Sequence, residues 1–152
     1  MSVPVPLKLG VILPTLNERG NIALLVERIE AALGPAGWEV IVVDDNSADG
    51  TADEARDLAR ADSRIRVLQR FGRRGLASAA IEGMCASAAR FVAVMDADHQ
   101  HDPALLVPML NAVSEGRADI AVASRFAEGG DASGLASARR EQGSRLANAL
   151  AR

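Results

Sequence analysis

The sequence predicts an α/β fold in which a mainly parallel sheet carries helices on both faces. Short runs of β-branched and other apolar residues alternate with longer segments whose apolar residues recur at helical spacing. The strand-like runs are apolar throughout, which is typical of parallel strands that are buried on both sides. A regular alternation of strands and helices builds a sheet of this kind.

Five runs are expected to form the strands. Residues 38–43 give the strongest prediction, because residues 40–43 are all β-branched. The other expected strands cover residues 8–14, 65–68, 91–95 and 119–124.

Helices are expected between these strands. In residues 22–33, apolar side chains recur at helical spacing, and Gly34 followed by proline ends the helix. Asp102 suits the N-cap of a helix that runs to Ser114, and Pro103 suits its first position, where no backbone hydrogen bond is lost. Further helices are expected at residues 51–61, 74–88 and 139–152, with a mobile loop at 128–137.

Composition narrows the class of protein. The chain has 152 residues, 49% of them hydrophobic, and a net charge of −3, which fits a soluble single domain. No apolar run approaches the ~20 residues that span a bilayer, and the first ten residues lack the pattern of a secretory signal. Cys85 is the only cysteine, so no disulfide forms within the chain. A mildly acidic chain has no overall attraction to nucleic acid, and we expect no such partner.

Polar residues stand directly after four of the predicted strands. Ligands bind at the carboxyl ends of strands in a parallel sheet, so these residues are the candidates for function. They are residues 14–18 after the first strand, Asp44 and Asp45 after the second, residues 96–101 after the fourth and Arg125 after the last.

Asp96 and Asp98 suggest a cation site. They are two residues apart at a strand end, so both side chains point to the same side, and Gln100 continues that side with an amide oxygen. Mg²⁺ and Mn²⁺ prefer such oxygen ligands and leave positions open for water or substrate phosphates. The alternative is a capped turn, because Asp-x-Asp also occurs in turns without any ligand.

Other candidates have two interpretations each. Asp44 and Asp45 either form a plain turn or accept hydrogen bonds from a ribose or a base. Arg125 either makes a surface salt bridge or contacts phosphate. His99 and His101 either bind metal or face solvent.

Two common phosphate-binding motifs are missing. No Gly-x-Gly-x-x-Gly follows the first strand, and the chain contains no Gly-Lys-Thr or Gly-Lys-Ser loop. This counts against a dinucleotide oxidoreductase and against a P-loop kinase.

Four stretches together resemble the inverting family 2 glycosyltransferases, which have the Rossmann-like GT-A fold of nucleotide-diphospho-sugar transferases. The stretches begin at Ile12 (ILPTLNERGN), Val42 (VVDDNSADGT), Met95 (MDADHQH) and Ala123 (ASR). Within the family, the chain is similar to the polyprenol (dolichol) phosphate mannose synthases. The stretches keep the family's order and spacing over nearly the whole chain.

The resemblance implies an activity. The chain would move mannose from GDP-mannose to a polyprenyl or dolichyl monophosphate, with inversion and with Mg²⁺ or Mn²⁺ as the cofactor. One alternative is a polyprenyl-phosphate glucosyltransferase or another family 2 enzyme that uses a UDP-sugar. Another is a non-catalytic nucleotide-sugar-binding module that needs a partner chain.

The resemblance also assigns site residues. Asp96, Asp98 and Arg125 would act in catalysis, and Asp96, Asp98 and Gln100 would bind the metal. Arg139, Arg140 and Ser144 would meet the phosphate of the acceptor. The nucleotide-sugar would be bound by Pro14, Leu16, Glu18, Val43, Asp44, Asp45, Met95, Asp96, Ala97, Asp98, Gln100 and Arg125.

The resemblance sets expectations about domains and location. Residues 1–127 would form the nucleotide-sugar-binding GT-A domain, and residues 128–152 a flexible loop with the start of an acceptor-side helix. Family members usually continue further, so we expect a chain that is short at its C-terminus. A lipid acceptor implies a peripheral place at the cytoplasmic face of a membrane, with a membrane-anchoring partner.

Overall fold

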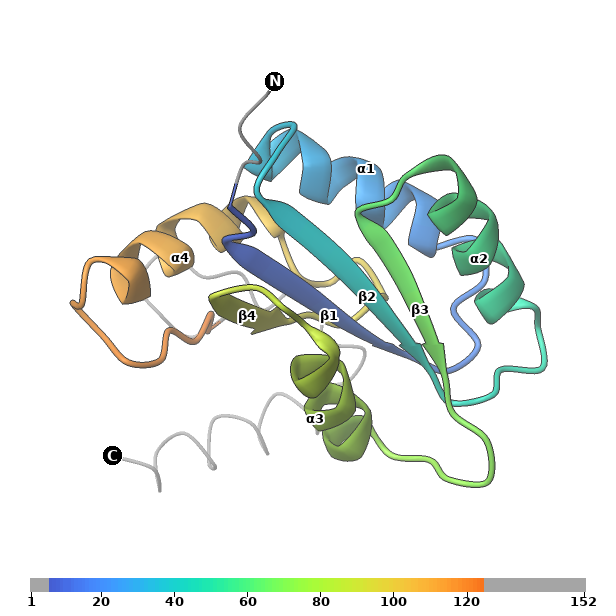
Figure 1. The fold of residues 1–152 in the computed structure, drawn as a ribbon. Coiled ribbons are helices and arrows are strands. Elements are labelled where there is room, and N and C mark those ends of the chain that lie inside the picture. Colours follow the sequence, from blue (N-terminus) through green and yellow to red (C-terminus); the bar gives the residue numbers. More distant parts are fainter. Residues whose placement is uncertain (1–5, 125–152) are drawn as a thin grey trace, which may run out of the picture.

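The computed structural model describes residues 6–124, which form a parallel sheet with helices against both of its faces (Figure 1). The sheet has four strands, β1 (Leu9–Thr15), β2 (Trp38–Asp44), β3 (Ile65–Gln69) and β4 (Phe91–Val94). Their order is β3-β2-β1-β4, and every pair of neighbours is parallel. The first four predicted strands and the α/β fold class are therefore confirmed.

Four α-helices and one 3₁₀ turn connect and flank the strands. They are α1 (Ile22–Leu33), α2 (Thr51–Ala61), α3 (Leu76–Ala86), η1 (Pro103–Leu105) and α4 (Leu106–Ser114). The larger core cluster joins α1, α2 and α4 to one face of the sheet, and a smaller cluster joins α3 to the other. The predicted helices at 22–33, 51–61, 74–88 and 102–114 are confirmed in place.

Local chemistry explains two helix starts. The Asp102 carboxylate accepts a hydrogen bond from the Ala104 backbone N–H at 3.1 Å, and Pro103 follows the cap as predicted. The first turn after this cap is 3₁₀ rather than α. Helix α3 begins two residues later than predicted, because Gly75 has a φ of 136°, which is outside the helical region.

The prediction of a strand at residues 119–124 is wrong. Residues 118–124 form neither a helix nor a strand; the chain only bends at residue 119. Ile120 and Val122 are 79% and 81% exposed. A strand is stabilised by a hydrogen-bonded neighbour and by burial of one face. The described residues provide neither, although residues 120–123 form a continuous apolar run like those of the other strands.

In the part that the structure describes, no helix is long and apolar enough to cross a membrane. The loop predicted at 128–137 and the helix predicted at 139–152 lie outside the described residues.

Candidate functional site

The candidate site lies at the carboxyl ends of the strands, where the order of the sheet reverses. The chain passes from β1 outward to β2 and β3, and then returns to place β4 on the other side of β1. In an open parallel sheet, such a reversal leaves a crevice outside the strand ends in which ligands bind. Pro14 and Leu16 border this point from β1, and residues 95–98 border it from β4.

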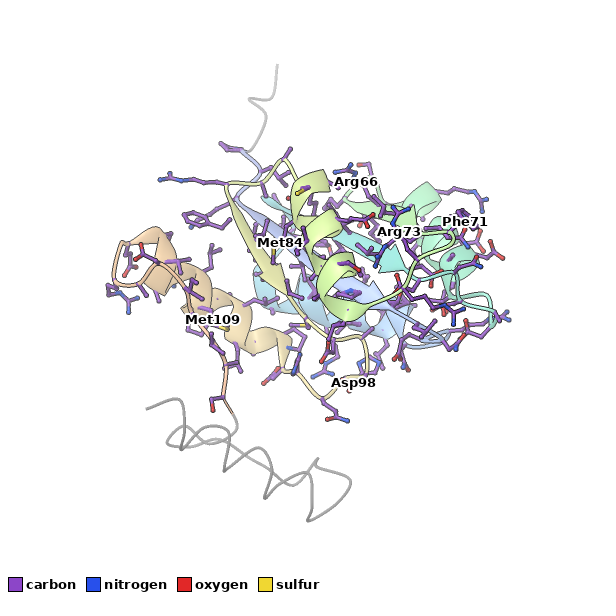
Figure 2. All side chains as sticks on the ribbon, turned by 90° about the horizontal axis from the view of Figure 1, so that it is seen from below. Arg66, Phe71, Arg73, Met84, Asp98 and Met109 are labelled. Carbon is purple, nitrogen blue, oxygen red and sulfur yellow. The ribbon has the colours of Figure 1, made fainter. Side chains whose placement is uncertain are left out.

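The loop after β4 exposes two carboxylates. The Met95 backbone N–H donates to the Ile12 carbonyl at 3.0 Å, so pairing with β1 continues one residue past the strand. Met95 and Ala97 are buried, whereas the Asp96 side chain is 47% exposed and Asp98 is exposed. Figure 2 shows Asp98 on this loop at the edge of the molecule. The alternation therefore leaves both acidic side chains open to solvent.

These carboxylates fit part of a divalent cation site. Carboxylate oxygens are the ligands that Mg²⁺ and Mn²⁺ prefer, and these ions usually keep several positions for water and phosphate. The Gln100 backbone N–H donates to Asp98 Oδ1 at 3.0 Å, which holds the loop in a turn. Within residues 6–124, no three His, Cys, Asp or Glu side chains converge closely enough to hold a metal ion. A cation held by Asp96 and Asp98 would therefore need further ligands besides the His, Cys, Asp and Glu side chains of residues 6–124.

Both histidines make contacts within this loop region. The Asp96 backbone N–H donates to His101 Nδ1 at 3.2 Å, and His101 Nε2 lies 3.9 Å from Asp96 Oδ2. His99 has a φ of 61°, and its Nδ1 lies 3.4 Å from Arg28 Nη1 of α1. Because arginine has no acceptor, this histidine nitrogen is the acceptor. Both rings therefore help to shape the loop, and a metal-binding role for either histidine stays a prediction.

Asp44 is buried, and its own turn engages both carboxylate oxygens. Asp44 Oδ2 accepts from the Ser47 backbone N–H at 2.9 Å. Its Oδ1 accepts from the Ser47 hydroxyl and, at 3.3 Å, from the Thr15 hydroxyl of β1. Asp44 therefore makes turn contacts at the end of β2 beside β1, and a contact with a ribose or a base stays a prediction.

Asp45 is also buried, and its partners come from further along the chain. Arg70 Nη1 donates to Asp45 Oδ1 at 2.8 Å, and the Gly75 backbone N–H donates to Asp45 Oδ2 at 2.7 Å. Arg70 is 1% exposed and follows β3 directly. The resemblance to the family implies that the segment from Arg70 to Gly83 lies near the donor sugar, but it gives Arg70 itself no role, although its position after a strand is the signal that singled out Asp44 and Asp45.

The loops after β1 and β2 bind each other. We call residues 16–21 and 45–50 the paired loops. The Asn17 backbone N–H donates to the Ser47 hydroxyl at 2.9 Å, and the Ala48 backbone N–H donates to Asn17 Oδ1 at 3.2 Å. The Arg19 backbone N–H donates to Asp49 Oδ2 at 3.0 Å. Two stretches that stand 30 residues apart in the sequence therefore form one unit beside the crevice.

Glu18 and Leu16 occupy different places in the first of these loops. Glu18 donates its backbone N–H to the Thr51 hydroxyl at 2.9 Å, and its carboxylate accepts from Asn21 Nδ2 at 2.7 Å. The Leu16 side chain is exposed. Pro14 and Val43 are buried and pair across β1 and β2. Their side chains therefore lie beneath the exposed surface at the carboxyl ends of these strands.

Four predicted site residues lie beyond the described part of the chain. They are Arg125, which was predicted to contact phosphate, and the acceptor-phosphate residues Arg139, Arg140 and Ser144. Their roles stay predictions.

Relatives found among curated proteins include two of similar identity. The chain is 40% identical over 124 residues to a dolichol-phosphate mannosyltransferase of Pyrococcus furiosus, covering 82% of this chain and 35% of the relative. It is 42% identical over 124 residues to a polyprenol monophosphomannose synthase of Mycolicibacterium smegmatis, covering 79% of this chain and 46% of the relative. The chain thus spans between a third and a half of the length of these relatives.

A solved structure shares the fold. The mannosyltransferase PcManGT of Pyrobaculum calidifontis, in complex with GDP-Man and Mn²⁺, superposes with a TM-score of 0.54 at 31% identity. The match covers 60% of this chain and 27% of that one. The family model for glycosyl transferase family 2 matches residues 10–150, a span that contains the paired loops, the strand ends and the two exposed carboxylates. The chain belongs to glycosyl transferase family 2.

Proposed function

We propose that this chain binds the sugar donor in a metal-dependent transferase that moves mannose from GDP-mannose to a polyprenyl monophosphate with inversion. The observation that carries the proposal is the pair of exposed carboxylates, Asp96 and Asp98, at the reversal point of the sheet. The names of the two curated relatives and the GDP-Man complex of the related structure support the choice of donor and acceptor.

Each part of the donor has a proposed set of residues. Asp96, Asp98 and Gln100 would hold Mg²⁺ or Mn²⁺, which when bound supplies positive charge to the diphosphate leaving group. Arg125 would add a second positive charge to the diphosphate. The nucleoside would lie against the strand ends and the paired loops, and its ligands are Pro14, Leu16, Glu18, Val43, Asp44, Asp45, Met95 and Ala97.

The proposed acceptor needs little acid–base catalysis from the protein. A phosphate monoester is already ionised at neutral pH, so its oxygen needs positioning against the anomeric carbon rather than a strong general base. Arg139, Arg140 and Ser144 are proposed to provide that positioning. Attack from the side opposite the nucleotide inverts the anomeric centre.

A lipid acceptor also bears on how the chain is divided and where the protein acts. Residues 1–127 are proposed as the nucleotide-sugar-binding domain and residues 128–152 as the approach to the acceptor. The protein would act peripherally at the cytoplasmic face of a membrane, together with an anchoring partner.

Calorimetry with GDP and UDP, with and without Mn²⁺, tests the donor site. We expect Mn²⁺-dependent binding of GDP that is tighter than that of UDP. Asp98→Asn should weaken it at least about tenfold, because a lost metal ligand typically costs more than a kilocalorie per mole. Asp57→Asn, which changes an exposed carboxylate on α2, is the matched control and should bind as the wild type does.

Three outcomes would change the proposal. Binding that needs neither Mn²⁺ nor the two aspartates contradicts it. Tighter binding of UDP than of GDP favours the UDP-sugar alternative. GDP binding without transfer of labelled mannose to a polyprenyl phosphate favours a nucleotide-sugar-binding module that needs a partner chain.

A further inference from the structure

The buried arginine after β3 bonds several partners at the carboxyl edge of the sheet. Arg70 Nη1 donates to Asp45 Oδ1 at 2.8 Å and to the Gly75 carbonyl at 3.2 Å. Its Nη2 donates to the Ser78 hydroxyl of α3 at 2.6 Å. Its own backbone N–H donates to the Asp44 carbonyl at 2.8 Å. One residue therefore joins the end of β2, the loop after β3 and the first turn of α3.

The remaining nitrogen of Arg70 has a weaker partner. Arg70 Nε lies 3.2 Å from Glu82 Oε1, within ion-pair distance, but makes no hydrogen bond of good geometry. Glu82 accepts two hydrogen bonds from Arg73 instead, at 2.9 and 2.6 Å, and these lower the pKa of its carboxyl group. The strong directional contacts of Arg70 thus point to Asp45, Gly75 and Ser78, not to Glu82.

Asp45 is fixed from both sides by this arrangement. One carboxylate oxygen accepts from Arg70 and the other from the Gly75 backbone N–H at 2.7 Å. Each carboxylate oxygen can accept a second hydrogen bond, so Asp45 keeps capacity for a ligand while its side-chain rotamer is fixed. A planar guanidinium holds several partners in set directions at once, which an ammonium cannot do.

We propose that Arg70 is a positioning residue of the donor site, because it orients the Asp45 carboxylate and fastens Gly75, at the start of α3, to the end of β2. This inference rests on the proposed function, in which Asp45 contacts the nucleoside. Arg70 is 1% exposed, so in this proposal it acts on binding through Asp45 rather than by contact with the nucleotide, which separates it from a residue that merely stabilises the fold.

The same strand offers a matched control at its other end. Arg64 precedes β3, bonds Asp62 and Glu30, and lies 4.1 Å above the ring of Trp38. It is as well connected as Arg70, but it lies at the amino end of the sheet, away from the strand ends that form the site. If the loss of any well-connected arginine weakened GDP binding, substitution of either residue would do so. A positioning role predicts weaker binding only when Arg70 is substituted.

The first test compares Arg70→Lys with Arg64→Lys. Lysine keeps the charge but cannot hold Asp45, Gly75 and Ser78 together. Arg70→Lys should raise the Kd for GDP in Mn²⁺ about tenfold, the size of a typical coupling between contacting residues. It should also speed hydrogen exchange of the Gly75 amide. Arg64→Lys should change neither quantity.

A double-mutant cycle gives the decisive measurement. If Arg70 acts through Asp45, then Asp45→Asn and the double variant Arg70→Lys/Asp45→Asn should bind GDP with the same Kd, within about twofold. Additive losses in the double variant would overturn the proposal. If Arg70→Lys does not fold, Ser78→Ala at an exposed residue removes the Nη2 contact together with the bond that the Ser78 hydroxyl donates to the Gly75 carbonyl. It should weaken GDP binding in the same direction, and an unchanged Kd contradicts the role.

Failure of this inference and failure of the proposed function look different. Wild-type GDP binding that Arg70→Lys leaves unchanged overturns the positioning role and leaves the donor site standing. A wild-type chain that binds no GDP overturns the donor site and, with it, the effect on binding. Gly75 exchange needs no nucleotide, so in that case it still decides whether Arg70 fastens the start of α3.

Discussion

At the scale of single residues, Asp49 shows how a short polar side chain joins the paired loops. Its Oδ1 accepts from the hydroxyl and the backbone N–H of Thr51, at 2.6 and 3.0 Å, and its Oδ2 accepts from the Arg19 backbone N–H at 3.0 Å. The Thr51 hydroxyl is the largest cause of a lowered Asp49 pKa, the amides of Arg19 and Thr51 act in the same direction, and burial opposes them.

These bonds predict that part of the free energy of unfolding is lost at low pH. Because the pKa of Asp49 is lower in the folded state, its contribution is complete above the unfolded value of about 4 and is lost as the pH falls through the folded value. Asp49→Asn should therefore reduce the free energy of unfolding at pH 7, and the difference from wild type should shrink at pH 3. Urea titrations at both pH values measure this. Asp57→Asn is the control, and an equal pH dependence in Asp49→Asn and wild type would contradict the prediction.

At the scale of elements, the contact between α3 and the sheet depends on the absence of a side chain. A Cβ added at Gly83 would lie 2.3 Å from Ile12 Cγ2 and 2.9 Å from Val43 Cγ2, both of which are core atoms rather than flexible ends. Helix α3 therefore packs directly on β1 and β2, with Ala79 in the same small cluster.

Gly83→Ala should destabilise the fold although alanine favours helices. The gain in helix propensity is about 1 kcal/mol, whereas overpacking a close-packed core costs about 1–3 kcal/mol. We expect a net loss in the free energy of unfolding, measured by urea titration. Cys85→Ala on an exposed position of the same helix should be nearly neutral. A Gly83→Ala variant as stable as wild type would show that α3 can move away from the sheet at no cost.

At the scale of the whole molecule, the single tryptophan and the candidate site lie at opposite ends of β2. Trp38 begins the strand, is buried, and donates its indole N–H to the Gly34 carbonyl at 2.6 Å. Asp44 ends the strand, about 20 Å away at the rise of an extended chain. Tryptophan emission therefore reports whether the fold is intact rather than what the site binds.

This separation gives a prediction for ligand binding. With GDP at about a hundred times its Kd and Mn²⁺ present, the free energy of unfolding should rise by about 2.7 kcal/mol, while the emission maximum of the folded protein stays unchanged. Denaturation followed by tryptophan fluorescence measures both. Asp98→Asn at the same nucleotide concentration should show a smaller rise, and a shift of the folded emission without stabilisation would argue for binding near Trp38.

The sequence predicts much of this arrangement because apolar periodicity determines which segments pack. Residues 38–43 and 22–33 show the two periodicities clearly, and parallel pairing then brings Asp44, Asp45, Asp96 and Asp98 to one edge. Hydrogen bonds between distant side chains leave no such periodic signal, so the bonds of Arg70 to Asp45 and of Ser47 to Asn17 could not be predicted. Residues 119–124 contain the apolar run of a buried strand but have no strand beside them among the described residues, which a local pattern cannot reveal.

The paired loops have a consequence for protein engineering. Because Asn17, Arg19, Ser47 and Asp49 satisfy one another across the two segments, exchanging one loop for that of another family member would orphan polar groups in the loop that remains. The smallest transplantable unit in this part of the fold is therefore both loops together. Chimeras of this part of the fold should be cut at the strand ends rather than within either loop.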